Sequence, residues 1–228
     1  MQLAISPAGN QTVATLGVKT AQVLHLPDGE VLAQWTGSPG QIRALEYCQD
    51  GRMVAALGGS SSVHLWDSRS GQEVLRFDGH ADRVLALAVM PDGDHIATGD
   101  RAGRILLWDS RSGSIEQELR SGGPPVAVLA CSPDGQSVAA SFDGGADAIF
   151  AVKPTLGSVA LSASNVTLSS LVFGRDGERL IGLTKQGGFR LWDAKSGQQI
   201  VAPAPPENLR MGSLLLDPDH DRILIGNQ

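Results

Sequence analysis

The residues with the clearest potential for chemistry are three aspartates near the end of the sequence. Asp217, Asp219 and Asp221 alternate in DPDHDR, a spacing with which calcium-binding loops present carboxylates. An EF-hand loop needs glycine where Arg222 stands and glutamate where Gln228 stands, so we interpret the segment as an acidic, solvated turn. The sequence also contains no nucleophile elbow, zinc-protease motif, phosphate-binding loop or paired-cysteine metal motif. We therefore expect no enzyme, no metal site and no cofactor.

One segment occurs twice almost without change. LWDSRSG follows SSSVH from Ser60 and RAGRIL from Arg101, and the tryptophans of three such segments, Trp66, Trp108 and Trp192, are 42 and 84 residues apart. Two sets of glycines keep the same interval: Gly9, Gly51, Gly93, Gly135 and Gly177, and then Gly29, Gly71, Gly113 and Gly197. A fixed period of this length indicates a repeat architecture.

Each period has the pattern of four short strands separated by turns. In the period that begins at Gly79, strand-like segments cover 84–90, 95–99, 104–109 and 114–119, with PDG, DRAG and SRSG between them. Proline presets φ and glycine accepts a positive φ, which suits tight turns. The sequence therefore predicts an all-β fold, a β-propeller of four-stranded antiparallel blades.

The Gly79-His80 pair and the three Trp-Asp pairs make the chain resemble the WD-repeat (WD40) β-propeller family. The resemblance covers essentially the whole chain. In that family a Trp, a Ser or Thr, a His, and an Asp in the turn before the third strand form a buried network that braces a blade. The first three positions fall on Trp108, Thr98 and His80.

The column of the turn aspartate departs from the family pattern. It falls on Ala102 in the repeat of Trp108, and on Ser60 and Gln186 in the repeats of Trp66 and Trp192. We therefore expect that no repeat has the full network and that all three tryptophans are architectural. We expect His64, in the third strand of its repeat, to face solvent.

The repeats divide the chain into about five and a half units of a single, partial propeller. Their bounds are about 1–36, 37–78, 79–120, 121–162, 163–204 and 205–228, and the last unit contains only the strand-like segments MGSLLLD and RILIGNQ. This chain alone is not expected to close the ring. Either it is part of a longer protein, the interpretation we favour, or another chain completes the last blade, because RILIGNQ would otherwise leave an apolar strand edge exposed.

Composition narrows the class of partner. The net charge of −6 argues against nucleic acid and anionic membranes, which require a concentrated positive surface. Cys48 and Cys131 lie in apolar runs, which suggests buried thiols and a reducing compartment. The first residues do not resemble a signal peptide, and no apolar run is long enough to span a bilayer. We expect a cytoplasmic protein.

The irregular turns before the first and third strands of each repeat are the candidate contact surface, because the blades offer a rigid platform for variable loops. The predicted contact residues are Gln41, Arg43, Asp82, Arg83, Arg101, Arg104, Asp143 and Lys185. The leading hypothesis is a non-catalytic scaffold that binds a protein or peptide. The alternatives are a sensor or regulatory domain of a signalling protein and a propeller hydrolase or lyase. The innermost strands oppose the enzyme, since Glu46 is the only carboxylate they offer.

Overall fold

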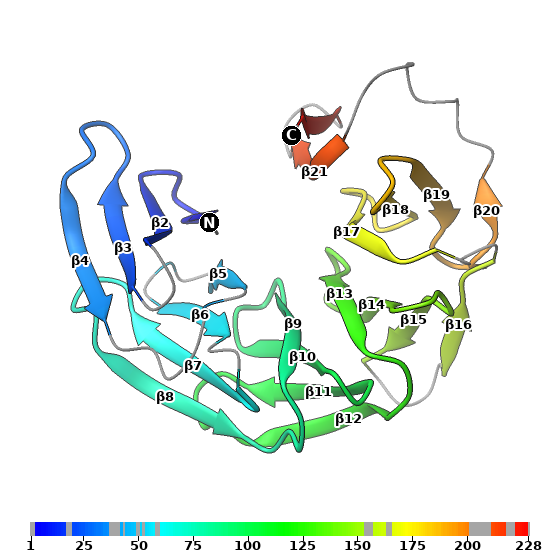
Figure 1. The fold of residues 1–228 in the computed structure, drawn as a ribbon, viewed down its shortest axis with the longest axis horizontal. Helices are drawn as coiled ribbons and strands as arrows, with labels where there is room; N and C mark the ends of the chain where they lie inside the picture. The colour runs from blue at the N-terminus through cyan, green and yellow to red at the C-terminus, as the bar shows by residue number, and fades with distance from the viewer. Residues whose placement is uncertain are drawn as a thin grey trace. The chain divides into compact units, whose positions relative to one another are not determined.

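All regular elements in the described part of the chain are β-strands. The computed structural model describes residues 3–16, 20–36, 42, 44–48, 51, 53–57, 60–152, 157–162, 166–200, 211–217 and 222–227. These residues form two compact units, Met1–Gly123 and Pro124–Gln228. Each unit is a series of antiparallel sheets in which every strand pairs with the next one along the chain (Figure 1).

The first unit contains three four-stranded sheets. Their strands are β1 (Leu3–Ile5), β2 (Gln11–Leu16), β3 (Thr20–His25) and β4 (Val31–Thr36); β5 (Leu45–Tyr47), β6 (Met53–Leu57), β7 (Ser62–Asp67) and β8 (Glu73–Asp78); and β9 (Val84–Val89), β10 (His95–Asp100), β11 (Arg104–Asp109) and β12 (Ile115–Ser121). The first strands of consecutive sheets are neighbours, β1 beside β5 and β5 beside β9. This is the arrangement of propeller blades.

The second unit contains two four-stranded sheets and one two-stranded sheet. Their strands are β13 (Val126–Cys131), β14 (Ser137–Phe142), β15 (Ala148–Ala151) and β16 (Ser158–Ala160); β17 (Leu168–Phe173), β18 (Arg179–Thr184), β19 (Phe189–Asp193) and β20 (Gln199–Ile200); and β21 (Met211–Asp217) and β22 (Arg222–Asn227). Here too the first strands are neighbours, β13 beside β17 and β17 beside β21.

The core of each unit lies between adjacent blades. Trp108 of the third blade is 1% exposed, and its ring centroid lies 5.6 Å from that of Phe77 in the second blade. Trp35 of the first blade stacks on Trp66 of the second, with centroids 5.7 Å apart. In the second unit the fully buried Trp192 packs in one cluster with residues of the fourth and fifth blades. A four-stranded sheet therefore buries its faces only when it has neighbours.

The repeated LWDSRSG segment forms a strand and the turn that follows it. Oδ1 of Asp109 accepts hydrogen bonds from the backbone N–H of Arg111 at 2.9 Å and of Ser112 at 2.6 Å, and from the Ser112 hydroxyl at 2.8 Å. Hydrogen bonds from Ser112 and Arg111 lower the pKa of Asp109, so the carboxylate is charged at neutral pH. Gly113 closes the turn with φ of 75°. The motif thus encodes a self-capped turn.

The structure confirms the predicted fold class. The chain is all-β, with four-stranded antiparallel blades, and the last described sheet has two strands, as predicted. Neither unit closes a ring by itself. Within DPDHDR, residues 218–221 lie outside the described residues, so the interpretation of an acidic turn stays a prediction. The division into repeats as one domain is also still a prediction.

Candidate functional site

The third blade contains a continuous buried hydrogen-bond network. Nε1 of Trp108 donates to Oγ1 of Thr98 at 2.7 Å, and Oγ1 of Thr98 lies 2.6 Å from Nε2 of His80. Nδ1 of His80 lies 2.8 Å from Oδ2 of Asp100. The side chains of His80 and Asp100 are fully buried.

The donors and acceptors of this network have one consistent assignment. Burial lowers the pKa of His80, despite the hydrogen bond and charge of Asp100, so the imidazole is neutral at pH 7. A carboxylate can only accept, so Nδ1 of His80 carries the proton and donates to Asp100. Nε2 of the neutral ring is then an acceptor, so the Thr98 hydroxyl donates to it while accepting from the Trp108 indole.

The prediction that no repeat has the full network was wrong for the third blade. The aspartate is Asp100, two residues before the predicted column at Ala102. The pairing of β10 with β9 shifts between Gly99 and Asp100, and such an irregularity re-aims the side chain of the following residue. The Asp100 carboxylate faces His80 with Oδ2, while Oδ1 accepts from the backbone N–H of Arg104 at 2.9 Å.

A threonine, a histidine and an aspartate linked by successive hydrogen bonds also suggest a hydrolytic triad. Thr98 is fully buried, and its hydroxyl already accepts a hydrogen bond from the Trp108 indole, so a substrate carbonyl has no path to it. The constellation therefore braces the blade. In the residues that the structure describes, no group of three or more His, Cys, Asp or Glu side chains could hold a metal ion.

The second and fifth blades fix their tryptophans differently. Nε1 of Trp192 donates to the backbone oxygen of Ser162 at 2.9 Å. Thr184 of the fifth blade stands in the column of Asp100, and its hydroxyl accepts from the Gly188 N–H at 3.0 Å, so a neutral group caps the turn. In the second blade, His64 is only 2% exposed, and its Nδ1 lies 3.0 Å from Oε2 of Glu73. The prediction that His64 faces solvent was therefore wrong. The paired carboxylate and the neighbouring ring of Trp66 make burial of this polar side chain possible.

The turns before the first and third strands come together in each of three blades. The backbone N–H of Arg101 donates to the oxygen of Arg83 at 2.8 Å, that of Asp143 to Pro125 at 2.9 Å, and that of Lys185 to Thr167 at 3.3 Å. Sequence reasoning placed these turns on one face, and the bonds join them in pairs.

The predicted contact residues differ in what they already bind. Arg83 and Arg101 are exposed, and neither guanidinium has an ion-pair partner among the described residues. Arg104 is engaged, with Nη1 donating to the Gly79 oxygen and Nη2 to Glu118, both at 2.8 Å. Its role as a contact residue stays a prediction.

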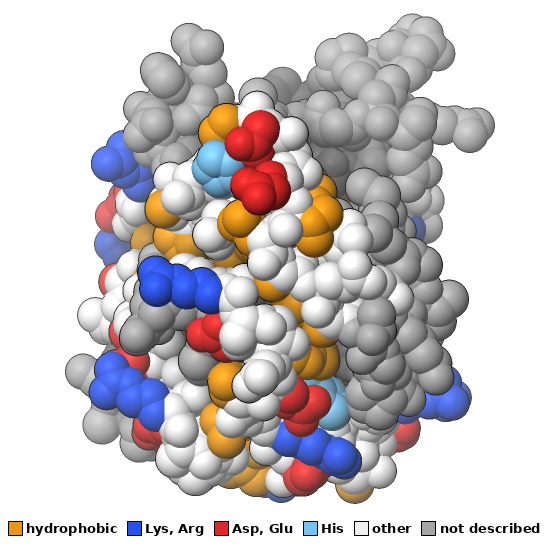
Figure 2. All heavy atoms as spheres, turned by 90° about the vertical axis from the view of Figure 1, so that its left-hand side faces the viewer, with side chains coloured by type: hydrophobic (Ala, Val, Ile, Leu, Met, Phe, Trp, Pro, Cys, Tyr) orange, Lys and Arg blue, Asp and Glu red, His pale blue; other side chains and the backbone are white. Residues whose placement is uncertain are grey.

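The other predicted contact residues lie on several turns. Oδ1 of Asp82 accepts from the Arg83 N–H at 2.7 Å. Lys185 and Asp143 are exposed and form an ion pair with 3.5 Å between Nζ and Oδ1. Gln41 and Arg43 lie outside the described residues. On the described part of the face in Figure 2, basic and acidic side chains lie close to one another, with hydrophobic side chains between them.

Comparison with known proteins identifies the repeats directly. The family model described as WD40, the WD domain, G-beta repeat, matches residues 29–67 and 71–109. A search of curated proteins finds no match. Among the described residues, no helix is long and apolar enough to cross a membrane. The two matched segments are WD40 repeats, and the four-stranded antiparallel sheets and the buried network of the described residues support a WD-repeat family for the chain.

Proposed function

We propose that the chain is a non-catalytic scaffold that binds a protein or peptide on the turns before the first and third strands of its blades. WD40 repeats generally serve as protein-interaction scaffolds, which supports this class of function. We further propose that the third blade carries the central contacts. A cytoplasmic location and the exclusion of nucleic acid and membrane partners stay predictions from the sequence.

One observation carries the choice of the third blade: two exposed arginines stand on turns that are fastened to each other. The turns are linked by the backbone bond from Arg101 to Arg83, by the His80–Asp100 contact of 2.8 Å, and by the bond from Arg104 to Gly79. Ordered turns lose little further entropy on binding, so their exposed guanidinium groups are suited to recognise an acidic segment.

The test is a charge reversal with a matched control. The doubly substituted Arg83→Glu, Arg101→Glu chain should lose the proteins that the tagged wild-type chain captures from its own cells, as measured by quantitative mass spectrometry. The control is Arg69→Glu, Arg111→Glu, which makes the same change of charge on the turns after the third strands. If both variants capture as much protein as the wild-type chain and their melting temperatures are unchanged, Arg83 and Arg101 are not part of the binding surface.

A further inference from the structure

His95, at the start of β10, lies between carboxylates of two other segments of the third blade. Its Nδ1 is 2.6 Å from Oδ2 of Asp92, in the turn between β9 and β10, and its Nε2 is 2.9 Å from Oε2 of Glu116, on β12. β12 is the outermost strand of this sheet, and β11 lies between it and β10. One imidazole ring therefore joins the outer edge of the blade to its first turn.

This bridge is a departure of the third repeat from the common pattern. In the first, second, fourth and fifth repeats, the position of His95 is occupied by Gln11, Met53, Ser137 and Arg179. The position of Glu116 is occupied in the same repeats by Leu32, Val74, Ser158 and Ile200. The other repeats form their blades without an imidazole and a carboxylate at these two positions, so the bridge is an addition to the fold and not a condition for it.

Both contacts of His95 are favourable only when the ring carries two protons. A neutral imidazole has one N–H donor, and its second nitrogen presents a lone pair. That lone pair would face a carboxylate oxygen, either 2.6 Å away at Asp92 or 2.9 Å away at Glu116. An imidazolium is instead attracted to both carboxylates. The arrangement is therefore that of a cation between two anions.

The surroundings of His95 stabilise the charged ring. Burial lowers the pKa of His95, but the hydrogen bond with Asp92 and the charges of Asp92, Glu116 and Asp109 outweigh burial, so the pKa is raised above 6.5. Arg111, two residues after Asp109, is bound to Asp94, with 2.6 Å between Nη2 and Oδ1. The side chain of His95 is 28% exposed, so protons reach it from solvent. The charged side chains around the ring are Asp92, Asp94, Asp109, Arg111 and Glu116.

We propose that His95 is a pH-sensitive clamp, which holds β12 to the turn between β9 and β10 while the ring is protonated and releases it when the proton is lost. Since the folded chain holds this proton more tightly than the unfolded chain, the clamp contributes its full stability below pH 6.5. The contribution is lost as the pH rises through the folded-state pKa of His95. Glu116 is then left without an imidazolium partner, and the blade has one positive charge fewer.

A second ion pair limits the release to the beginning of β12. Oε2 of Glu118, two residues after Glu116, lies 2.8 Å from Nη2 of Arg104 on β11. A guanidinium does not lose its charge at neutral pH, so this contact stays in place while His95 titrates. The clamp therefore acts on the first residues of the strand and leaves the rest of the blade paired.

Two measurements on the full chain test the clamp. The ring signals of His95 are followed by NMR between about pH 5 and 8, and hydrogen exchange of the β12 amides that pair with β11 is measured at both limits. We expect Glu116→Gln to lower the pKa of His95. Relative to their intrinsic rates, the wild-type amides at the beginning of β12 should exchange about threefold to fivefold faster at the upper limit. His95→Gln should abolish this dependence on pH.

Glu118→Gln is the matched control, because it removes a carboxylate from the same strand whose partner stays charged. It should speed the exchange of β12 by the same factor at both pH limits. His25, whose Nδ1 lies 3.0 Å from Oδ1 of Asp28, is the reference histidine, and its titration should be the same in wild type and Glu116→Gln. The proposal would be overturned by an unchanged titration of His95 in Glu116→Gln, or by wild-type exchange at β12 that does not respond to pH. Neither measurement involves a partner, so the outcome is independent of the binding surface proposed above.

Discussion

Glu46 tests how a half-buried carboxylate joins two blades. It lies on β5, and its Oε2 accepts a hydrogen bond of 2.8 Å from the backbone N–H of Val89 in β9. Burial raises the pKa of Glu46 from 4.5 to about 7, and the hydrogen bond from Val89 offsets only part of this effect. The folded chain therefore holds a proton at this site that the unfolded chain releases at lower pH.

The sign and size of the effect follow from linkage. Since the folded-state pKa lies above the unfolded one, the free energy of unfolding falls as the pH rises from about 4.5 to 7 and then levels off. Each unit of pKa corresponds to about 1.4 kcal/mol, so the shift from 4.5 to about 7 amounts to roughly 3 kcal/mol. Glu46→Gln removes the titration while it keeps the shape and an oxygen that can accept from Val89.

The assay is urea unfolding of both chains between pH 4.5 and 8. We expect similar stability at the lower limit and a variant that is more stable by up to roughly 3 kcal/mol at the upper limit. Glu30→Gln, on an exposed carboxylate, should show no such divergence. If the wild-type and Glu46→Gln curves run parallel over this range, the carboxylate is not desolvated in the way the structure implies.

Two further predictions concern the third blade. Trp108→Ala should destabilise the chain by about 3 to 5 kcal/mol in chemical denaturation, because the indole is buried against Phe77; a change below 1 kcal/mol would contradict inter-blade packing of this ring. Thr98→Val removes the hydroxyl that links Trp108 to His80 and should lower the unfolding free energy by about 1 to 3 kcal/mol. Thr12→Val, on a hydroxyl with one backbone acceptor, should have a smaller effect.

The sequence was sufficient to predict the blades because turn glycines and alternating strands are local signals. Gly93 and Gly113 adopt positive φ where the period requires it, and β9 to β12 begin and end within about two residues of the predicted segments. No local signal locates a bulge, so the aspartate of the network was assigned to the wrong residue. The pairing shift that aims Asp100 at His80 becomes visible only when β9 and β10 are placed side by side.

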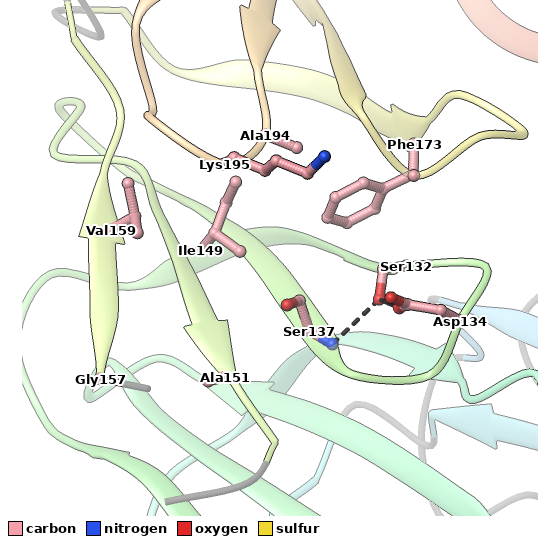
Figure 3. Close-up of a pocket in the computed structure, with 11 residues that line it drawn as sticks. Ser132, Asp134, Ser137, Ile149, Ala151, Gly157, Val159, Phe173, Ala194 and Lys195 are labelled. Carbon is pink, nitrogen blue, oxygen red and sulfur yellow. Dashed lines mark hydrogen bonds between the residues drawn. The ribbon is translucent and has the colours of Figure 1, made fainter. Parts of the chain in front are cut away.

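Features that depend on side-chain contacts between strands, within a blade or between blades, were harder to predict. His64 looked like an ordinary outward-facing strand residue, yet Glu73 on the neighbouring strand and the ring of Trp66 hold it in a buried site. Ser132 and Phe173 line one pocket although they belong to neighbouring blades (Figure 3), a pairing that no single repeat reveals. Comparison of register positions between repeats would have singled out Ala151, which stands where the second, third and fifth repeats have Asp67, Asp109 and Asp193.

The third and fourth blades have the same four-stranded fold but are stabilised by different polar contacts. In the third blade, His80 and Asp100 fasten the two turns that carry Arg83 and Arg101, so polar groups buried at one end of the blade hold exposed charges in place. In the fourth blade, the column of Asp100 holds the buried Phe142, and Asp147 instead accepts from the Phe142 N–H at 3.1 Å. That blade retains its packing without the network. At the end of its third strand, Ala151 stands where the third blade has Asp109, so the fourth blade also lacks the carboxylate that accepts from the Ser112 N–H in the third.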